Sequence, residues 1–179
     1  MVERVLAGPA RLGAVRLVAL DGPSGAGKST VAAALADRLR SRCSVAVVPT
    51  DHFATWDAPV AWWPRLVDGV LTPLRRGRAG RYRPMDWSGG APVLGTAVVD
   101  VPVPDVLVVE GVSAGRCSVR PLLTSLVWVE LADPAVRLAR SVARDGERFR
   151  ADLRRWQRFE TGWFAVDGTR AVADATATP

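Results

Sequence analysis

The chain has 179 residues, of which 49% are apolar, and a formal net charge of +6. A chain of this length and apolar content can build one buried core, which excludes an intrinsically disordered protein. No apolar run approaches the ~20 residues of a membrane-spanning helix, so we expect no membrane partner.

The chain begins with residues 1–12, whose mixed charges and lack of a signal-peptide core indicate a cytoplasmic protein. The short apolar run Val15–Leu20 predicts a buried strand that leads into a glycine-rich stretch. Apolar residues recur at helical spacing over Ser29–Arg42, and a second strand is predicted at Val45–Pro49. Residues 50–53 therefore form a loop at the carboxyl end of that strand.

The middle of the chain is rich in tryptophan and proline and shows weaker periodicity. We predict a helix around Arg65–Arg76, followed by irregular or hairpin structure through Trp87–Pro104. Two further buried strands are predicted, one at Val106–Val109, which ends at Glu110, and one at Leu126–Leu131.

The C-terminal part is predicted to be mainly helical. Asp133 can cap a helix whose first residue is Pro134, and the helical pattern continues from there with a break near Gly146. Residues 171–178 fit either a short last strand or a loose tail. Strands that alternate with helices imply parallel βαβ units, so we predict an α/β fold in a single domain over residues 1–179.

The glycine-rich stretch Gly22–Ser29 matches the phosphate-loop pattern G-x-x-x-x-G-K-[ST]. In such a loop, backbone N–H groups hold phosphate oxygens, Lys28 reaches the β- and γ-phosphates, and Ser29 places a hydroxyl on magnesium. The alternative, a turn that binds nothing, is disfavoured by the strand before the loop and the helix after it, whose N-terminus attracts anions. Lys28 is also the only lysine of the chain. The predicted contacts to ATP, bound with Mg²⁺, are Gly22, Ser24, Gly25, Ala26, Gly27, Lys28, Ser29 and Thr30.

Two acidic residues lie where predicted strands end: Asp51 after the second strand and Glu110 at the end of the third. Ligands of open parallel sheets bind at this edge. A carboxylate there can organise magnesium or its waters, or it can take a proton from an acceptor hydroxyl. The alternatives are a helix cap for Asp51 and a turn acid for Glu110.

Arginines recur three, four and four residues apart near the C-terminus, a spacing that places them on one face if the helix is continuous. Arginines over a transferring phosphoryl group stabilise its negative charge. The alternative is a solvated face whose arginines pair with the nearby acids Asp133, Asp145 and Glu147. The four arginines are Arg137, Arg140, Arg144 and Arg148.

Together these features resemble the uridine kinase-like nucleoside kinases, a family related to phosphoribulokinase and pantothenate kinase. The resemblance covers roughly residues 15–160. The motifs occur in family order as Gly22–Thr30, Asp51-His52-Phe53, Pro84-Met85-Asp86, Glu110-Gly111, Arg144-Asp145 and Glu147-Arg148-Phe149-Arg150. We therefore predict a P-loop NTPase fold, with a parallel sheet in the order 2-3-1-4-5 flanked by helices, and an arginine-bearing helical lid at about residues 137–152.

The resemblance also implies roles for single residues. Asp51 would be the catalytic base that orients the acceptor hydroxyl, and Asp86 would bind sugar hydroxyls. Arg144, Arg148 and Arg150 would form the lid over the phosphates. The sequence departs from the family at Ala54 and Met85, which stand where the family has tyrosine, and at Phe149, which replaces a glycine. These departures fall on the acceptor side and leave the acceptor open.

The predicted site has four parts. The catalytic residues are Lys28, Asp51, Arg144 and Arg148, and Arg150 joins the phosphate loop in binding the nucleotide. The metal residues are Ser29 and Glu110, and the substrate residues are His52, Arg83 and Asp86, in an acceptor region over about residues 51–100. The aromatic residues Trp56, Trp62, Trp63, Tyr82 and Trp87 either line that pocket or pack in the core, and the same choice holds for Trp156 and Glu160.

We predict an ATP-dependent kinase that transfers the γ-phosphate to a hydroxyl of a small molecule, with a uridine- or cytidine-like nucleoside as the first candidate. The first rival is a kinase for an antibiotic, a vitamin precursor or a sugar. The second is an NTP-binding regulatory or nucleic-acid-binding module, which a basic surface away from the cleft would indicate. The arginines form no contiguous patch, so nucleic acid is not the expected partner, whereas a homo-oligomer stays open. Cys43 and Cys117 are expected to be reduced, and His52, the only histidine, cannot form a histidine metal cluster.

Overall fold

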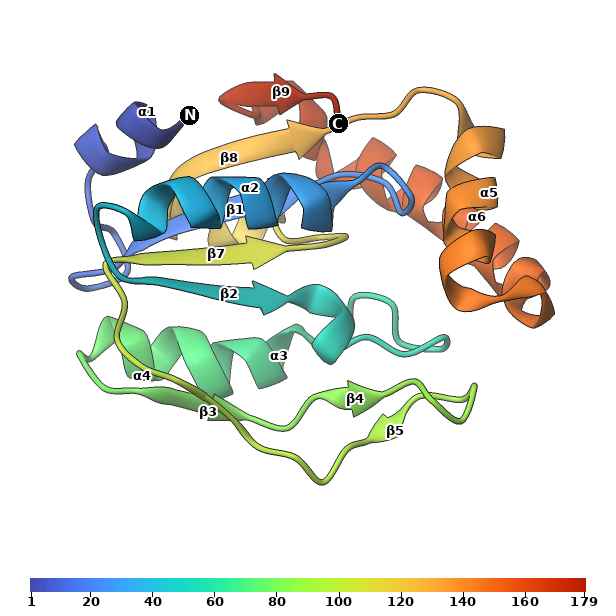
Figure 1. The fold of residues 1–179 in the computed structure, drawn as a ribbon, viewed down its shortest axis with the longest axis horizontal. Helices are drawn as coiled ribbons and strands as arrows, with labels where there is room; N and C mark the ends of the chain where they lie inside the picture. The colour runs from blue at the N-terminus through green and yellow to red at the C-terminus, as the bar shows by residue number, and fades with distance from the viewer.

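The computed structural model describes all 179 residues, and its centre is a five-stranded sheet in the order β2-β7-β1-β8-β9 (Figure 1). All neighbouring strands of this sheet pair in parallel. Counted along the chain, the order is 2-3-1-4-5, which confirms the predicted α/β class and strand order. The five strands are β1 (Arg16–Asp21), β2 (Val45–Pro49), β7 (Val106–Glu110), β8 (Leu123–Val129) and β9 (Ala175–Ala177).

Helices cover both faces of the sheet, so the central strands are buried on both sides. In β1, Val18 and Leu20 pack into a cluster with α2 (Lys28–Arg40) and α1 (Val2–Ala7). Leu17 and Ala19 point the other way, into the larger cluster that includes the aromatic residues of the middle of the chain. This alternation follows from the two-residue period of a strand. It explains why the strands have continuous apolar runs.

The predicted helix around Arg65–Arg76 is present, but it is interrupted. It consists of α3 (Trp63–Leu66), a π-helical turn (η2, Val67–Leu71) and α4 (Thr72–Arg75). Pro73 has no N–H to donate to the carbonyl four residues before it, and a π turn lets the helix continue past such a position.

Two small antiparallel ladders follow the interrupted helix and lie below the main sheet in Figure 1. β3 pairs with β6, and β4 pairs with β5, which confirms the predicted hairpin structure before the third main strand. These ladders begin at Gly80, earlier than the predicted Trp87. The four short strands are β3 (Gly80–Tyr82), β4 (Met85–Asp86), β5 (Val93–Leu94) and β6 (Val99–Val101).

The two longest C-terminal helices, α5 (Pro134–Asp145) and α6 (Arg150–Asp167), pack against each other beside the carboxyl ends of the strands (Figure 1). Asp133 caps α5 by accepting from the N–H groups of Ala135 and Val136, as predicted. Gly146 ends α5 with a φ of +107°, a backbone conformation that favours glycine. No helix is both long and apolar enough to span a membrane.

Four shorter helical turns complete the chain: η1 (Thr50–His52), η3 (Cys117–Leu122), η4 (Glu147–Phe149) and η5 (Thr169–Val172). The sequence missed α1, whose single buried residue is Val5, because one buried side chain makes no helical period. It also placed the fourth strand three residues late, because Thr124 and Ser125 interrupt the apolar run at the start of β8 although Ser125 is buried.

Candidate active site

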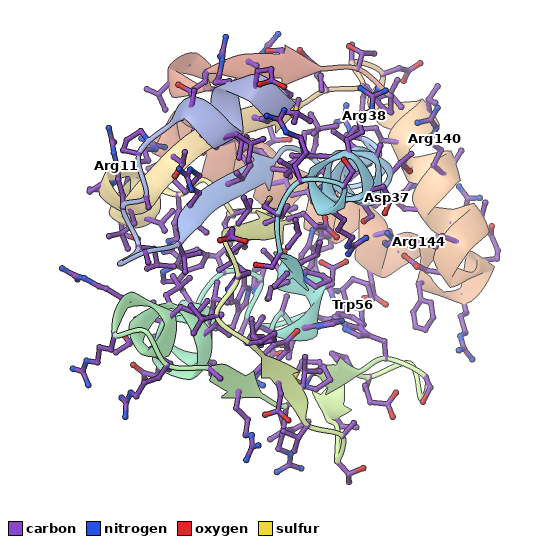
Figure 2. All side chains as sticks on the ribbon, turned by 60° about the vertical axis from the view of Figure 1, so that its left-hand side comes forward. Arg11, Asp37, Arg38, Trp56, Arg140 and Arg144 are labelled. Atoms are coloured by element: carbon purple, nitrogen blue, oxygen red, sulfur yellow. The ribbon has the colours of Figure 1, made fainter.

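A cavity of about 760 Å³ lies at the carboxyl ends of the central strands, between the phosphate loop, the end of β7, and the helices α5 and α6. Figure 2 shows Arg140 and Arg144 along α5, with Trp56 below them, and all three line this cavity. Six charged residues of the predicted site or arginine row contribute to its wall: Lys28, Asp51, Glu110, Arg140, Arg144 and Arg148. The fold therefore brings together segments that are more than 100 residues apart in the chain.

The phosphate loop is held against the ends of β8 and α5. Gly22 and Gly25 both have positive φ, and a Cβ on either would lie 2.2 Å from the carbonyl oxygen of Val129 and 2.3 Å from that of Arg137, respectively. Only glycine fits these two positions, which explains their place in the motif. The helix that follows begins at Lys28 without a capping side chain, so its first N–H groups remain free for an anion.

Most of the loop residues predicted to bind the nucleotide line the cavity: Ser24, Gly25, Gly27, Lys28, Ser29 and Thr30. Gly22 and Ala26 do not, because Gly22 packs on β8 and the Ala26 side chain belongs to the core cluster under α2. Lys28 is buried, and its ammonium donates to the carbonyl oxygen of Pro23 at 2.9 Å. The ammonium is therefore held at the loop by one neutral acceptor, not by a carboxylate.

The predicted metal residues lie in contact. The Ser29 hydroxyl donates to Glu110 Oε1 at 3.0 Å, and Glu110 is 8% exposed. Burial and the charge of Asp51 raise the pKa of Glu110, whereas Lys28, the Ser29 hydrogen bond and Arg144 lower it. A hydroxyl with one or two carboxylates fits Mg²⁺, which takes oxygen ligands and usually shares them with water and substrate phosphate. No group of three or more His, Cys, Asp or Glu side chains forms a closed metal site.

Asp51 lies in the helical turn η1, directly after β2, and its side chain lines the cavity. It caps no helix, since Pro49 occupies the cap position of that turn and no backbone N–H donates to the Asp51 carboxylate. Its main-chain carbonyl accepts from Trp87 Nε1 at 3.0 Å, which ties the turn to the hairpin. The Asp51 carboxylate thus lies at the exposed edge of the cavity and has no hydrogen-bond donor of its own.

The arginine row divides. Arg140, Arg144 and Arg148 line the cavity even though Gly146 breaks the helix between Arg144 and Arg148, so the role of Arg144 and Arg148 as lid residues stays a prediction. Arg144 forms a bidentate pair with Asp145, at 2.6 and 2.8 Å, and this hydrogen bond raises its pKa. The guanidinium of Arg148 lies 4.7 Å from the centre of the Phe149 ring.

Two other arginines of the predicted lid do not line the cavity. Arg137 donates to the carbonyls of Leu131 and Ala132 and so braces the loop between β8 and α5. Arg150 pairs with Glu147 at the surface, as the solvated-face alternative supposed. The structure therefore does not support the predicted contact of Arg150 with the nucleotide. The 3₁₀ turn between α5 and α6 places the Arg150 guanidinium beside Glu147.

The three predicted substrate residues also lie outside the cavity wall. His52 is half-buried, and its Nδ1 forms a 2.8 Å hydrogen bond with the hydroxyl of Tyr82. Arg83 and Asp86 are exposed: Arg83 donates to the carbonyl of Gly95, and Asp86 accepts from the N–H of Ser88. The motif placed these residues near the acceptor, but the β4–β5 hairpin uses their polar groups to stabilise its own turns.

Aromatic residues form another part of the cavity wall, which is called the acceptor-side wall below because the proposed acceptor would lie there. Trp56 makes edge contacts with Trp87 (5.0 Å between ring centres) and Trp156 (5.8 Å), and lies 6.1 Å from Phe149. All four line the cavity. Trp62, Trp63 and Tyr82 are buried in the core, so the packing alternative holds for them. The sequence pattern does not distinguish the aromatic residues that line the cavity from those in the core, because aromatic side chains are common in both environments.

Several cavity residues were not predicted as site residues. They are Ser88, Gly111, Val112, Ser141, Asp145, Phe149 and Leu153, and the last four lie on α5, η4 or α6. Phe149 had a usable signal, since it replaces a glycine between two lid arginines. Ser141 and Leu153 had none, because a serine or leucine in a helix is ordinary.

No protein-family model matches this chain, and no curated protein matches it in sequence. Among solved structures, a "Possible Uridine Kinase" from Bacillus stearothermophilus is similar to it at 19% identity and a TM-score of 0.68, covering 98% of this chain and 94% of the other. A Silicibacter sp. TM1040 protein with the provisional name of a fructose transport system kinase is 23% identical, with a TM-score of 0.68 and coverages of 98% and 96%.

A third structure, D-glycerate 3-kinase from Cryptococcus neoformans, is 15% identical, with a TM-score of 0.56 and coverages of 76% and 70%. The three proteins are named for different acceptors. At these identities the likeness establishes the fold, and the predicted fold of a parallel sheet in the order 2-3-1-4-5 flanked by helices is thereby confirmed.

Proposed function

We propose that this protein is an ATP-dependent kinase that transfers the γ-phosphate to a hydroxyl group of a small molecule. The observation that carries the proposal is the free carboxylate of Asp51, which shares one cavity with Lys28 of the phosphate loop. A phosphate site alone would suit any NTP-binding protein. A carboxylate in the same cavity can accept the proton of an attacking hydroxyl, which is what a kinase requires.

On the nucleotide side, the free N–H groups at the start of α2 hold phosphate oxygens, and the Lys28 ammonium neutralises the charge of the transferring group. Ser29 and Glu110 would hold Mg²⁺, which supplies charge neutralisation between the phosphates when it is bound. Arg140, Arg144 and Arg148 face the same space. They stabilise the negative charge that spreads over the equatorial oxygens during transfer.

On the acceptor side, Asp51 orients the hydroxyl and takes its proton, and the aromatic wall binds the rest of the acceptor. The indole N–H groups of Trp56 and Trp87 are used on backbone carbonyls, at 3.2 and 3.0 Å. The wall therefore offers ring faces and edges, which favour a flat or apolar group. A pyrimidine nucleoside such as uridine or cytidine fits that requirement and is our first candidate.

A second candidate is a kinase for a different small alcohol. It is favoured by the position of Arg83 and Asp86, whose polar groups stabilise the β4–β5 hairpin and leave few fixed donors and acceptors for sugar hydroxyls. The fructose and glycerate names of two similar structures also support a wider range of acceptors in this fold.

The experiment is a panel of acceptors with MgATP, followed by ADP release. The panel contains pyrimidine and purine nucleosides, sugars, glycerate, pantothenate-like alcohols and aminoglycosides. We expect one chemical class to raise ADP release well above the rate without acceptor. Equal rates with every acceptor and with none would overturn the proposal and leave an NTP-binding module.

A further inference from the structure

A carboxylate lies buried beneath the phosphate loop without lining the cavity. Glu160 of α6 is 1% exposed, and both of its oxygens accept from the backbone N–H of Ser24, at 3.1 and 3.0 Å. Burying a carboxylate is costly unless hydrogen bonds compensate, so this contact between two segments 136 residues apart constrains both of them.

The face of α6 that carries Glu160 also reaches the cavity. Leu153, Trp156 and Glu160 are spaced three and four residues apart, which places them on one side of the helix. Leu153 and Trp156 line the cavity, and Trp156 makes an edge contact with Trp56 of the acceptor-side wall. One helix face therefore connects the start of the phosphate loop with the aromatic residues that face the acceptor.

The positive charge of Lys28 lies near the Glu160–Ser24 contact and also constrains this part of the loop. Lys28 is close enough to Glu160 to lower its pKa, against the rise that burial causes. Lys28 donates its hydrogen bond to Pro23, the residue before Ser24. The loop segment Pro23–Ser24 is thus fixed from two sides, by the ammonium of Lys28 and by the carboxylate of Glu160.

We propose that Glu160 is a positioning residue that fixes the Ser24 end of the phosphate loop to α6 and couples occupancy of the loop to Trp156 in the acceptor-side wall. The inference rests on the proposed function in that MgATP binds in the loop. The Ser24 N–H donates to Glu160, so Glu160 acts through the position of the loop and does not touch the ligand. A residue that only anchors α6 would affect folding and leave nucleotide affinity unchanged.

The test uses the full chain with MgATP as the probe and the variants Glu160→Ala and Glu160→Gln. The matched control is Glu130→Ala, which removes a glutamate that pairs with Arg170 outside the cavity. Calorimetry gives the dissociation constant, and tryptophan fluorescence gives the signal on binding. The share of that signal that depends on Trp156 is found by comparison with Trp156→Phe. Thermal unfolding reports stability separately.

We expect Glu160→Ala to weaken MgATP binding by roughly tenfold or more, because it removes a hydrogen bond to a charged group. It should also remove most of the Trp156-dependent signal. Glu160→Gln keeps one acceptor oxygen, so an intermediate effect of roughly threefold is expected, and it decides the matter if the alanine variant fails to fold. Glu130→Ala should bind as the wild type does.

Wild-type affinity and a full Trp156 signal in both Glu160 variants would overturn the inference, even if their unfolding temperature falls. The proposed function fails in a different way: the wild type itself would then not bind MgATP or would phosphorylate no acceptor. The two failures are therefore distinguishable in the same set of titrations.

Discussion

The two sides of the cavity differ in how their residues are supplied. On the nucleotide side, the residues that line the cavity from the phosphate loop lie within Ser24–Thr30, one continuous segment that runs from the loop after β1 into the first turn of α2. On the acceptor side, Trp56, Trp87 and the pair Phe149 and Trp156 come from three separate parts of the chain. A motif can specify the first side through local backbone geometry, whereas the second depends on how distant segments pack.

This difference between the two sides shows for which residues the family resemblance predicts the position of a side chain. The phosphate loop and Glu110 are brought together by the parallel register of β1 and β7, in which Leu20 pairs with Glu110. Asp86 and Arg83 sit on a small hairpin outside that register, so their motif does not fix where their side chains lie. Asp51 is proposed to take the proton of the hydroxyl that attacks the transferred phosphate, so a substitution at this residue tests whether the two sides of the cavity work together.

The largest effect is expected for Asp51→Asn. Asparagine keeps the size of the side chain but cannot accept the proton of the acceptor, so phosphorylation should fall by roughly 10²–10⁴-fold, while MgATP affinity changes little. The measurement is the rate of acceptor phosphorylation against magnesium concentration, with calorimetry for MgATP.

Recovery of the Asp51→Asn variant by added magnesium would instead make Asp51 a metal residue. Full activity at ordinary magnesium would remove its catalytic role altogether. In that case no residue would be assigned to take the proton of the acceptor hydroxyl.

Lys28→Ala tests the nucleotide side. The Lys28 side chain is buried, and under the proposed function its ammonium stabilises the transferring phosphate, so its loss should cost about 2–4 kcal/mol of transition-state stabilisation. Turnover and nucleotide binding are measured on protein whose folding is checked by thermal unfolding. Unchanged turnover would contradict the phosphate-loop assignment.

Arg148→Ala should have a smaller effect than Lys28→Ala, and the difference distinguishes the role of the lid from that of the phosphate loop. The guanidinium meets its charge mainly in the transition state, so kcat should fall by roughly tenfold to a hundredfold while the MgATP dissociation constant changes less. Arg155→Ala is the matched control, because Arg155 pairs with Asp152 away from this cavity. Equal kcat in both variants would return Arg148 to a solvated surface role.

The smallest effects are expected on the acceptor side. They test whether the aromatic residues, and not Asp86, contact the acceptor. Trp56→Leu keeps an apolar side chain but loses the ring, so the acceptor KM should rise by roughly threefold to tenfold, the range of an aromatic contact. Asp86→Ala should leave KM nearly unchanged, because its exposed carboxylate accepts only from the N–H of Ser88. A larger effect for Asp86→Ala would reinstate it as a substrate residue.

Much of the fold could be predicted because each main strand carries its own signal. β2 has the predicted bounds Val45–Pro49, and the Asp133 cap and the Gly146 break lie where turn and cap chemistry place them. The π turn Val67–Leu71 could not be predicted from periodicity, since a π turn differs from an α-helix by one residue in the hydrogen-bond pattern.

The place of a side chain in the cavity was predictable where its surroundings are set by its neighbours in sequence, as for Ser29 and Lys28. It was not predictable where a side chain chooses between two partners. Arg150 pairs with Glu147, and His52 bonds to Tyr82. Glu160 is the opposite case: its contact with Ser24 depends wholly on the packing of α6 and leaves no local mark in the sequence.

The most direct test of the proposed transfer is the fate of a labelled γ-phosphate. Wild-type protein is incubated with γ-labelled ATP, Mg²⁺ and the best acceptor of the panel, and label is measured in the acceptor and in inorganic phosphate. A kinase in which Asp51 takes the proton of the acceptor hydroxyl places nearly all released label in the acceptor. Label that enters inorganic phosphate at the same rate with and without acceptor would contradict phosphoryl transfer and indicate a hydrolysing NTP-binding module.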